Sequence, residues 1–144
     1  MAKTASEIGT YLDAQGFGTL AASTGTGIFV GPMPIDPDKA IAVRVSGGPP
    51  PEYTQETTTP WNERTRVQVM IRDAKTTTGY DTAEDVANSI ARTLENVRHM
   101  KLPTATGTLY GTVHPSSPVT PFNQDERDRP IFIANFEINK EPST

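Results

Sequence analysis

Three segments of the sequence alternate apolar and polar residues with the period of two that a β-strand requires. They are AIAVRV at 40–45, RTRVQVMIR at 64–72 and IFIANFEIN at 131–139. The apolar residues expected on one shared face are Ile41, Val43, Val45, Val67, Val69, Ile71, Phe132, Ala134, Phe136 and Ile138. The pattern predicts a sheet with one face on a core and a second face that is charged and solvated or meets a partner.

Two helices are predicted beside these strands. Residues 82–100, TAEDVANSIARTLENVRHM, place apolar side chains at steps of three and four. Thr82 or Asp81 would cap the start of this helix, and the basic residues from Arg98 to Lys101 would suit its C-terminal end. A shorter amphipathic helix is expected over about residues 5–15, with Thr4 and Glu7 spaced as a capping box and Gly16 as the stop. The expected fold is α+β, a single mixed, largely antiparallel sheet with an N-terminal helix and one long helix packed on one face.

The length and the net charge of the chain restrict the classes of function that it can have. A chain of 144 residues fits one domain, 1–144, around one core. The 13 Lys and Arg against 17 Asp and Glu give a net charge of -4, without the basic field of a free nucleic-acid or membrane binder. The absence of Cys excludes disulfides and Cys nucleophiles, and no apolar run is long enough to span a bilayer. We expect a protein that is assembled in the cytoplasm and does not bind membranes.

An extended arm is predicted at residues 46–63, where the sequence SGGPPPEYTQETTTPWNE is too long for a tight hairpin. Its three consecutive prolines favour an extended form. Tyr53 and Trp61, the single Trp, lie in this arm. A Trp beside a proline can anchor its own loop to the core, but Tyr and Trp in an arm are also typical interface anchors, and both interpretations stay open.

The sequence gives little support for a catalytic site or for a metal or cofactor site. His99 and His114 lack a second ligand at metal-binding spacing. The glycines of TGTGIFVG precede a predicted strand, whereas a phosphate-binding loop opens a helix. The carboxylates of the DERDR run, 125–129, are interleaved with arginines, which is typical of a solvated turn. We therefore expect no catalytic residue, no metal and no organic cofactor.

The order of these features resembles the tail terminator proteins of long-tailed, non-contractile bacteriophages, also described as tail completion or minor capsid proteins. The residues that carry the resemblance are RVQVMIRD leading through TAEDVANSIARTLENV, then Asp125, the Asp128-Arg129-Pro130 turn and Asn135-Phe136. Members often have Gly where Asp128 stands, so the turn is expected to differ here.

The resemblance implies a virion protein of the neck that assembles into a ring, usually of six identical subunits. Such a ring binds the end of the completed tail tube, stops its polymerisation and meets the head-completion or stopper proteins, while DNA passes through its lumen without sequence-specific binding. The candidate interface residues are Tyr53, Trp61, Arg64, Arg66, Asp125, Arg127 and Arg129. The DERDR charges would pair across a subunit boundary or meet a neighbouring ring, or else form a solvated turn without a partner.

Two alternatives remain open. The chain could be a different ring of the neck or tail, such as a head-tail stopper or the tube protein, because these also use small α+β or β-rich subunits. It could instead be a monomeric binding domain, or a small enzyme, whose site is the arm around Tyr53 and Trp61.

Overall fold

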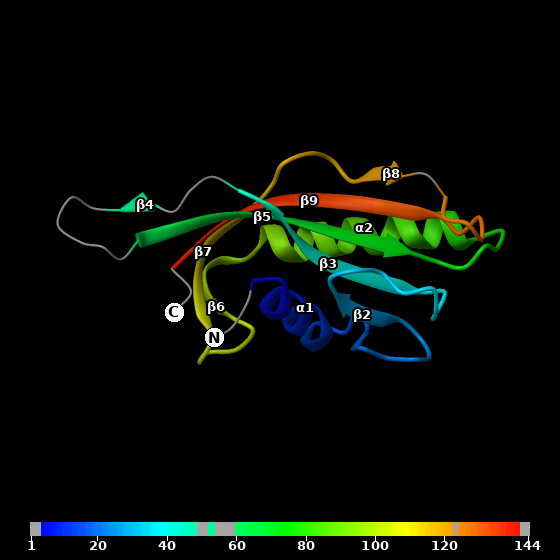
Figure 1. Cartoon of the computed structure of the whole chain (residues 1–144), viewed down its shortest axis with the longest axis horizontal. Helices are drawn as coiled ribbons and strands as arrows, with labels where there is room; N and C mark the ends of the chain where they lie inside the picture. The colour runs from blue at the N-terminus through cyan, green and yellow to red at the C-terminus, as the bar shows by residue number, and fades with distance from the viewer. Residues whose placement is uncertain (1–3, 49–51, 54–59, 123, 142–144) are drawn as a thin grey trace.

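The computed structural model describes residues 4–48, 52–53, 60–122 and 124–141, and for residues 52–53 and 60–62 it describes the backbone alone. The elements in this part are α1 (Thr4–Ala14), β1 (Thr19–Leu20), β2 (Gly27–Val30), β3 (Ala40–Gly47), β4 (Glu52–Tyr53), β5 (Pro60–Arg72), α2 (Gly79–Glu95), β6 (Arg98–Leu102), β7 (Thr108–Pro115), β8 (Thr120–Phe122) and β9 (Ile131–Lys140). Figure 1 shows their arrangement around one long, curved sheet.

The sheet has the strand order β1-β2-β3-β5-β9-β7-β6, with β4 added beside β5 and β8 beside β9. β1, β2 and β3 run parallel, and the pairs from β3 onward are antiparallel. The three segments with the clearest alternation are the adjacent central strands β3, β5 and β9. Their register places Val43 beside Val69, and Val69 beside Ala134. The predicted α+β fold with a mixed, largely antiparallel sheet is confirmed.

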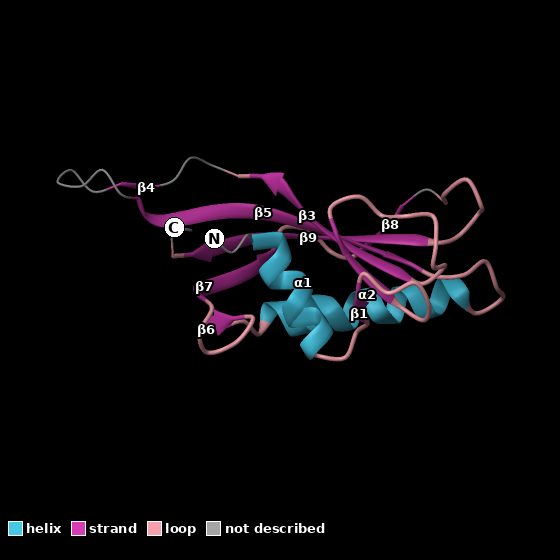
Figure 2. Cartoon of the chain, turned by 60° about the horizontal axis from the view of Figure 1, so that its bottom comes forward, coloured by secondary structure: helices cyan, strands magenta, loops and turns pink. Residues whose placement is uncertain are grey.

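Both helices cover the same face of the sheet (Figure 2). α2 lays Ala83, Ala87, Ile90 and Leu94 on the apolar residues of β5, β7 and β9, while α1 packs on β2 and β3. The residues predicted for the covered face are buried, except that Val45 is 50% exposed near the end of β3. No helix of the described part covers the other face, which we call the open face.

The structure corrects the bounds of the long helix. α2 begins at Gly79 rather than Thr82, with Thr78 as its N-cap residue, and ends at Glu95 rather than near Met100. Residues 98–102 form β6 on β7 instead, so Arg98, His99 and Lys101 do not lie in a last helical turn. These residues form backbone hydrogen bonds with a strand that follows in the sequence, and helical periodicity cannot show such a partner.

The start of α1 also differs from the predicted capping box. Glu7 is buried, and its carboxylate accepts a hydrogen bond from the Tyr110 hydroxyl at 2.9 Å rather than capping the helix. The predicted stop at Gly16 agrees with the structure: Gly16 has φ +87°, and the N–H of Phe17 donates to Leu12 O. A left-handed residue at this position closes a helix and is best tolerated as glycine.

Candidate interface sites

The candidate interface residues fall at the two ends of β5. Arg64 and Arg66 lie near its start, next to β4, whereas Asp125, Arg127 and Arg129 gather around Arg72 at its end. Arg72 lies eight positions along the extended strand from Arg64, which corresponds to about 26 Å. The sequence predicted one interface set, and the structure divides it into an arm end and a second, distant end.

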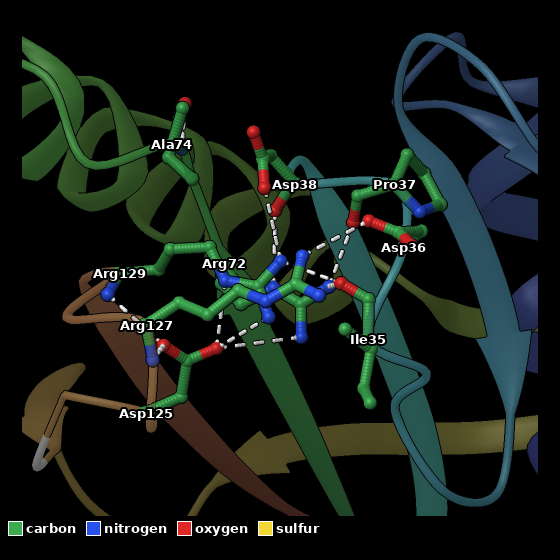
Figure 3. Close-up of polar contacts among 10 residues, drawn as sticks. Ile35, Asp36, Pro37, Asp38, Arg72, Ala74, Asp125, Arg127 and Arg129 are labelled. Carbon is green, nitrogen blue, oxygen red and sulfur yellow. Dashed lines mark hydrogen bonds and ion pairs between the residues drawn. The ribbon is translucent and has the colours of Figure 1, made fainter.

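At the second end, two buried arginines hold three chain segments together (Figure 3). Arg72 donates from Nε to the carbonyl of Asp38 at 3.0 Å, and from Nη2 to that of Pro37 at 2.7 Å. Arg129 donates from Nε to Asp125 Oδ2 at 2.7 Å and from Nη1 to Asp38 Oδ1 at 3.0 Å. Both guanidinium groups also donate to the carbonyl of Ile35. We call Arg72, Asp125, Arg129 and the loop Ile35–Asp38 the arginine clasp.

Burial and pairing set the charges of the clasp. Burial lowers the pKa of Arg72, and the positive charge of Arg129 lowers it further, against the attraction of Asp125, Asp38 and Asp36. Burial alone would raise the pKa of Asp125, but hydrogen bonds from the Arg129 side chain and from the backbone N–H groups of Arg129 and Arg127 bring it below the usual value. The clasp therefore combines ionised side chains whose donors are largely satisfied by carbonyls and carboxylates.

The turn that carries Asp125 is built by the same carboxylate. Asp125 Oδ1 accepts hydrogen bonds from the backbone N–H groups of Arg127 and Arg129, each at 3.0 Å. Asp128 closes the turn with φ +57°, the left-handed region that glycine adopts most easily and that Asp tolerates better than most residues. A turn that accepts glycine at this position is thus compatible with the Asp found here.

Around the clasp, the surface is charged and partly apolar. Arg127 pairs with Asp36 and Lys75 with Asp128, both at 3.3 Å and both exposed. Ile35 is 50% exposed, and Phe122, which pairs with Ile131 across β8 and β9, is 54% exposed. Exposed apolar side chains within a rim of charges are a common composition of protein interfaces.

The arm end has a different composition. Arg64 and Arg66 are exposed on the open face, and Arg66 lies across from Glu137. The backbone of β4 pairs with the start of β5, at Glu52 with Asn62 and Tyr53 with Pro60. The side chains of Tyr53 and Trp61 lie outside the described residues, as do residues 49–51 and 54–59 of the predicted arm at 46–63. Their contacts therefore stay predictions.

A buried ionic group near the arm end was not predicted from the sequence. Lys140, at the end of β9, is fully buried, with Nζ 3.7 Å from Glu7 Oε1 and 3.8 Å from Glu63 Oε2. Burial, and then the adjacent Glu7, raise the pKa of Tyr110. The group ties α1 to β9 and to the base of the arm at Glu63. The only sequence signal was a lysine at the even-numbered, covered positions of β9.

The family model of bacteriophage tail terminator proteins matches residues 11–142. The chain belongs to this family. A search of curated proteins found no match. The match confirms the predicted family and makes the protein a structural component of a phage tail.

The two histidines of this tail terminator lie on the neighbouring strands β6 and β7. His99 lies exposed in β6 and His114 exposed in β7, on separate strands. Among the described residues, there is no group of three or more His, Cys, Asp or Glu side chains suited to a metal ion. No helix in the described ranges has the length and apolar character needed to cross a membrane.

The tail terminator also has a groove of about 600 Å³ between α2 and residues 115–119. It forms where β9 passes from its pairing with β7 to its pairing with β8, because residues 116–119 leave the sheet there. Asn88, Arg92 and Glu95 line the helix side, and Ser116 and Ser117 line the other.

Proposed function

We propose that this tail terminator forms a ring, of six subunits, that binds the end of the completed tail tube and stops its polymerisation. The ring joins the tail to the head-completion or stopper protein in the neck of the virion, and DNA passes through its lumen without sequence-specific contacts. Its work is structural, without catalysis, metal or organic cofactor, and it assembles in the host cytoplasm.

The observation that carries this proposal is the separation of two unlike surfaces along β5. A ring of identical subunits needs two different, complementary surfaces on each chain, because the contact joins the front of one copy to the back of the next. The arm end offers arginines and the base of a predicted arm, whereas the clasp end offers Ile35, Phe122 and paired charges. The family match supports a tail protein, and the two surfaces support its assembly.

The clasp suits such an end surface because it fixes two loops that would otherwise be free to move. Ile35 and Asp36 belong to the loop held by Arg72, and Arg127 belongs to the turn held by Asp125. A surface ordered in advance loses less conformational entropy when it binds. We propose that Arg127, with Asp36 and Ile35, contacts a neighbouring subunit or ring, and that Asp125 and Arg129 hold this surface in place from within the subunit.

The test combines the purified protein with tail tubes. Light scattering after size-exclusion chromatography should give the mass of a closed oligomer, either alone or once tubes are added. Electron microscopy should show a ring at one end of each tube, and tube growth should stop when the protein is present. A protein that stays monomeric and leaves tube length unchanged would contradict the proposal and favour a monomeric binding domain.

A further inference from the structure

The open face of the sheet carries an excess of positive charge. Arg44, Arg64 and Arg66 are exposed there, on β3 and β5, and His114 is exposed on β7. Glu137 is the acidic residue of β9 that lies across from both Arg66 and His114. On β3, β5 and β9, outside the clasp, this face has three arginines against one glutamate, so this part of it is cationic on a chain whose net charge is -4.

The same face is ordered by side-chain hydrogen bonds. Arg44 donates from Nε to Gln68 Oε1 at 2.8 Å, and Gln68 donates in turn to Asn135 Oδ1 at 3.3 Å. The next row across the strands is apolar: the buried Ala42 pairs with the half-buried Met70, and Met70 with the half-buried Ile133. Rows of cations, amides and apolar side chains side by side are suited to a protein surface more than to a nucleic-acid backbone alone.

The outward side of α2, across the molecule from the open face, is acidic. α2 buries one side on the covered face of the sheet, so its outward side points away from the open face (Figure 2). The exposed charged residues of that helix are Asp81, Glu84, Asp85, Arg92 and Glu95. Four carboxylates against one arginine give this side the charge sign opposite to that of the open face.

We infer that the open face of one subunit binds the acidic outward side of α2 on the next subunit. This inference rests on the proposed ring and adds a contact between its subunits to those proposed at the arm end and the clasp end. The two surfaces are different and lie on opposite sides of one chain, which is the arrangement a head-to-tail contact requires. Their opposite charges favour this pairing and oppose contact between two like faces.

The test uses charge reversal on each side. The sheet-face variant carries Arg44→Glu and Arg66→Glu, and the helix-face variant carries Glu84→Arg and Asp85→Arg. Each variant alone brings like charges together, so its apparent dissociation constant for self-association should rise by at least about tenfold. A control chain carries Arg98→Glu and Lys101→Glu, two exposed positions on the edge strand β6, which lies three strands away from β5 in the sheet. It makes the same change in net charge and should assemble like the wild type, because the contact is placed on β3 and β5.

Mixing the two variants provides the decisive measurement. Each reversed surface then meets an oppositely charged partner, so a 1:1 mixture should recover the mass of the wild-type oligomer by light scattering. A single chain with all four substitutions should recover it too. Recovery on mixing also shows that both variants are folded. Wild-type assembly should weaken between about 0.1 and 1 M salt, over which the screening length falls from about 10 to 3 Å.

Other outcomes would overturn the inference. If the wild type forms rings and both variants assemble equally well, the ring stands but uses other surfaces. Loss of assembly that neither mixing nor the four-substitution chain restores would also contradict it. If the sheet-face variant assembles normally but loses retention of a DNA duplex, the open face contacts nucleic acid instead. A wild type that is monomeric even with tubes would overturn both this inference and the proposed function.

Discussion

Asp125 links the turn at 125–129 to the arginine clasp, because its two carboxylate oxygens bind one each. Its Oδ1 atom receives the two turn N–H groups, and its Oδ2 atom receives Arg129 Nε at 2.7 Å. Asp125→Asn keeps the shape but removes the negative charge beside two buried guanidinium groups. We expect a loss of about 2 to 3 kcal/mol in the free energy of unfolding at pH 7. Urea denaturation measures it.

The pH dependence of the same variant is an independent prediction. The pKa of Asp125 is lower in the folded chain than its ordinary value of 3.8. Its contribution is therefore fully present above the unfolded pKa and is lost as the pH falls through the folded pKa. The difference in stability between wild type and Asp125→Asn should stay constant near neutral pH and shrink below about pH 4. Asp128→Asn, at an exposed pair, is the matched control and should cost less than about 1 kcal/mol.

Lys140 and Glu7 provide a test of the buried ionic group. Lys140→Met leaves the Glu7 carboxylate buried without its cation, which should cost about 3 to 5 kcal/mol. Adding Glu7→Gln removes the stranded charge, so the double variant should regain most of that stability. Thermal unfolding of Lys140→Met, of the double variant and of Glu7→Gln alone, compared with the wild type, completes a double-mutant cycle for this pair. Equal melting temperatures for wild type and Lys140→Met would show that the pair contributes nothing.

At the scale of elements, the packing of α2 decides the stability of the covered face. Ile90 and Leu94 are at most 1% exposed and lie against the sheet. Replacing either by Ala should reduce the free energy of unfolding by about 2 to 5 kcal/mol, because a cavity remains. Ser89→Ala, at an exposed position of the same helix, should change it by less than about 0.5 kcal/mol. An unchanged melting temperature for Leu94→Ala would contradict the packing.

The elements differ in how far the sequence predicts them. β3, β5 and β9 and the buried side of α2 follow from periods of two and about 3.6, because burial on one face imposes those periods directly. The end of α2 was placed too late because Val97 and Met100 continue a helical spacing by coincidence. Residues 98–102 pair with β7 instead. The periodicity of one segment shows which of its faces is buried but does not show which other segment it pairs with.

In the candidate sites too, sequence periodicity could not show which individual residues are covered by segments distant in the sequence. Alternation along β5 grouped Arg72 with Arg64 and Arg66, yet Arg72 is 5% exposed because the loop at residues 35–38 covers it. Arg129 was grouped with the charges of a solvated turn, whereas the structure buries it between Asp125 and Asp38. Both differences arise from segments distant in the sequence. Whether Asp125, Arg127 and Arg129 also serve an interface stays a prediction.

At the scale of the whole molecule, β5 unites the proposed surfaces. It is 13 residues long, it pairs with β3 and β9, and it begins at the arm and ends at the clasp. A long strand that is paired on both sides from Arg66 to Arg72 is stiff, so a contact at the arm end holds the clasp end at a fixed distance and direction. We expect subunits of a ring to need such stiffness, since small angular errors would prevent closure.

The last prediction concerns the arm at residues 46–63, which we expect to contact a neighbouring subunit or ring rather than its own core. Replacing residues 49–59 by a short Gly-Ser turn keeps Glu63 beside Lys140 and should leave a folded subunit that assembles poorly. Its prolines limit the conformational freedom lost on binding, and Tyr53 and Trp61 supply the apolar area.

Trp61→Ala separates the two interpretations of this residue. If Trp61 is an interface anchor, the substitution reduces tube capping at an unchanged melting temperature. If it is a core anchor, the substitution lowers the melting temperature while the folded fraction still caps tubes. Thermal unfolding and tube capping measured on both variants decide the matter, and lost stability with intact capping would refute the interface role.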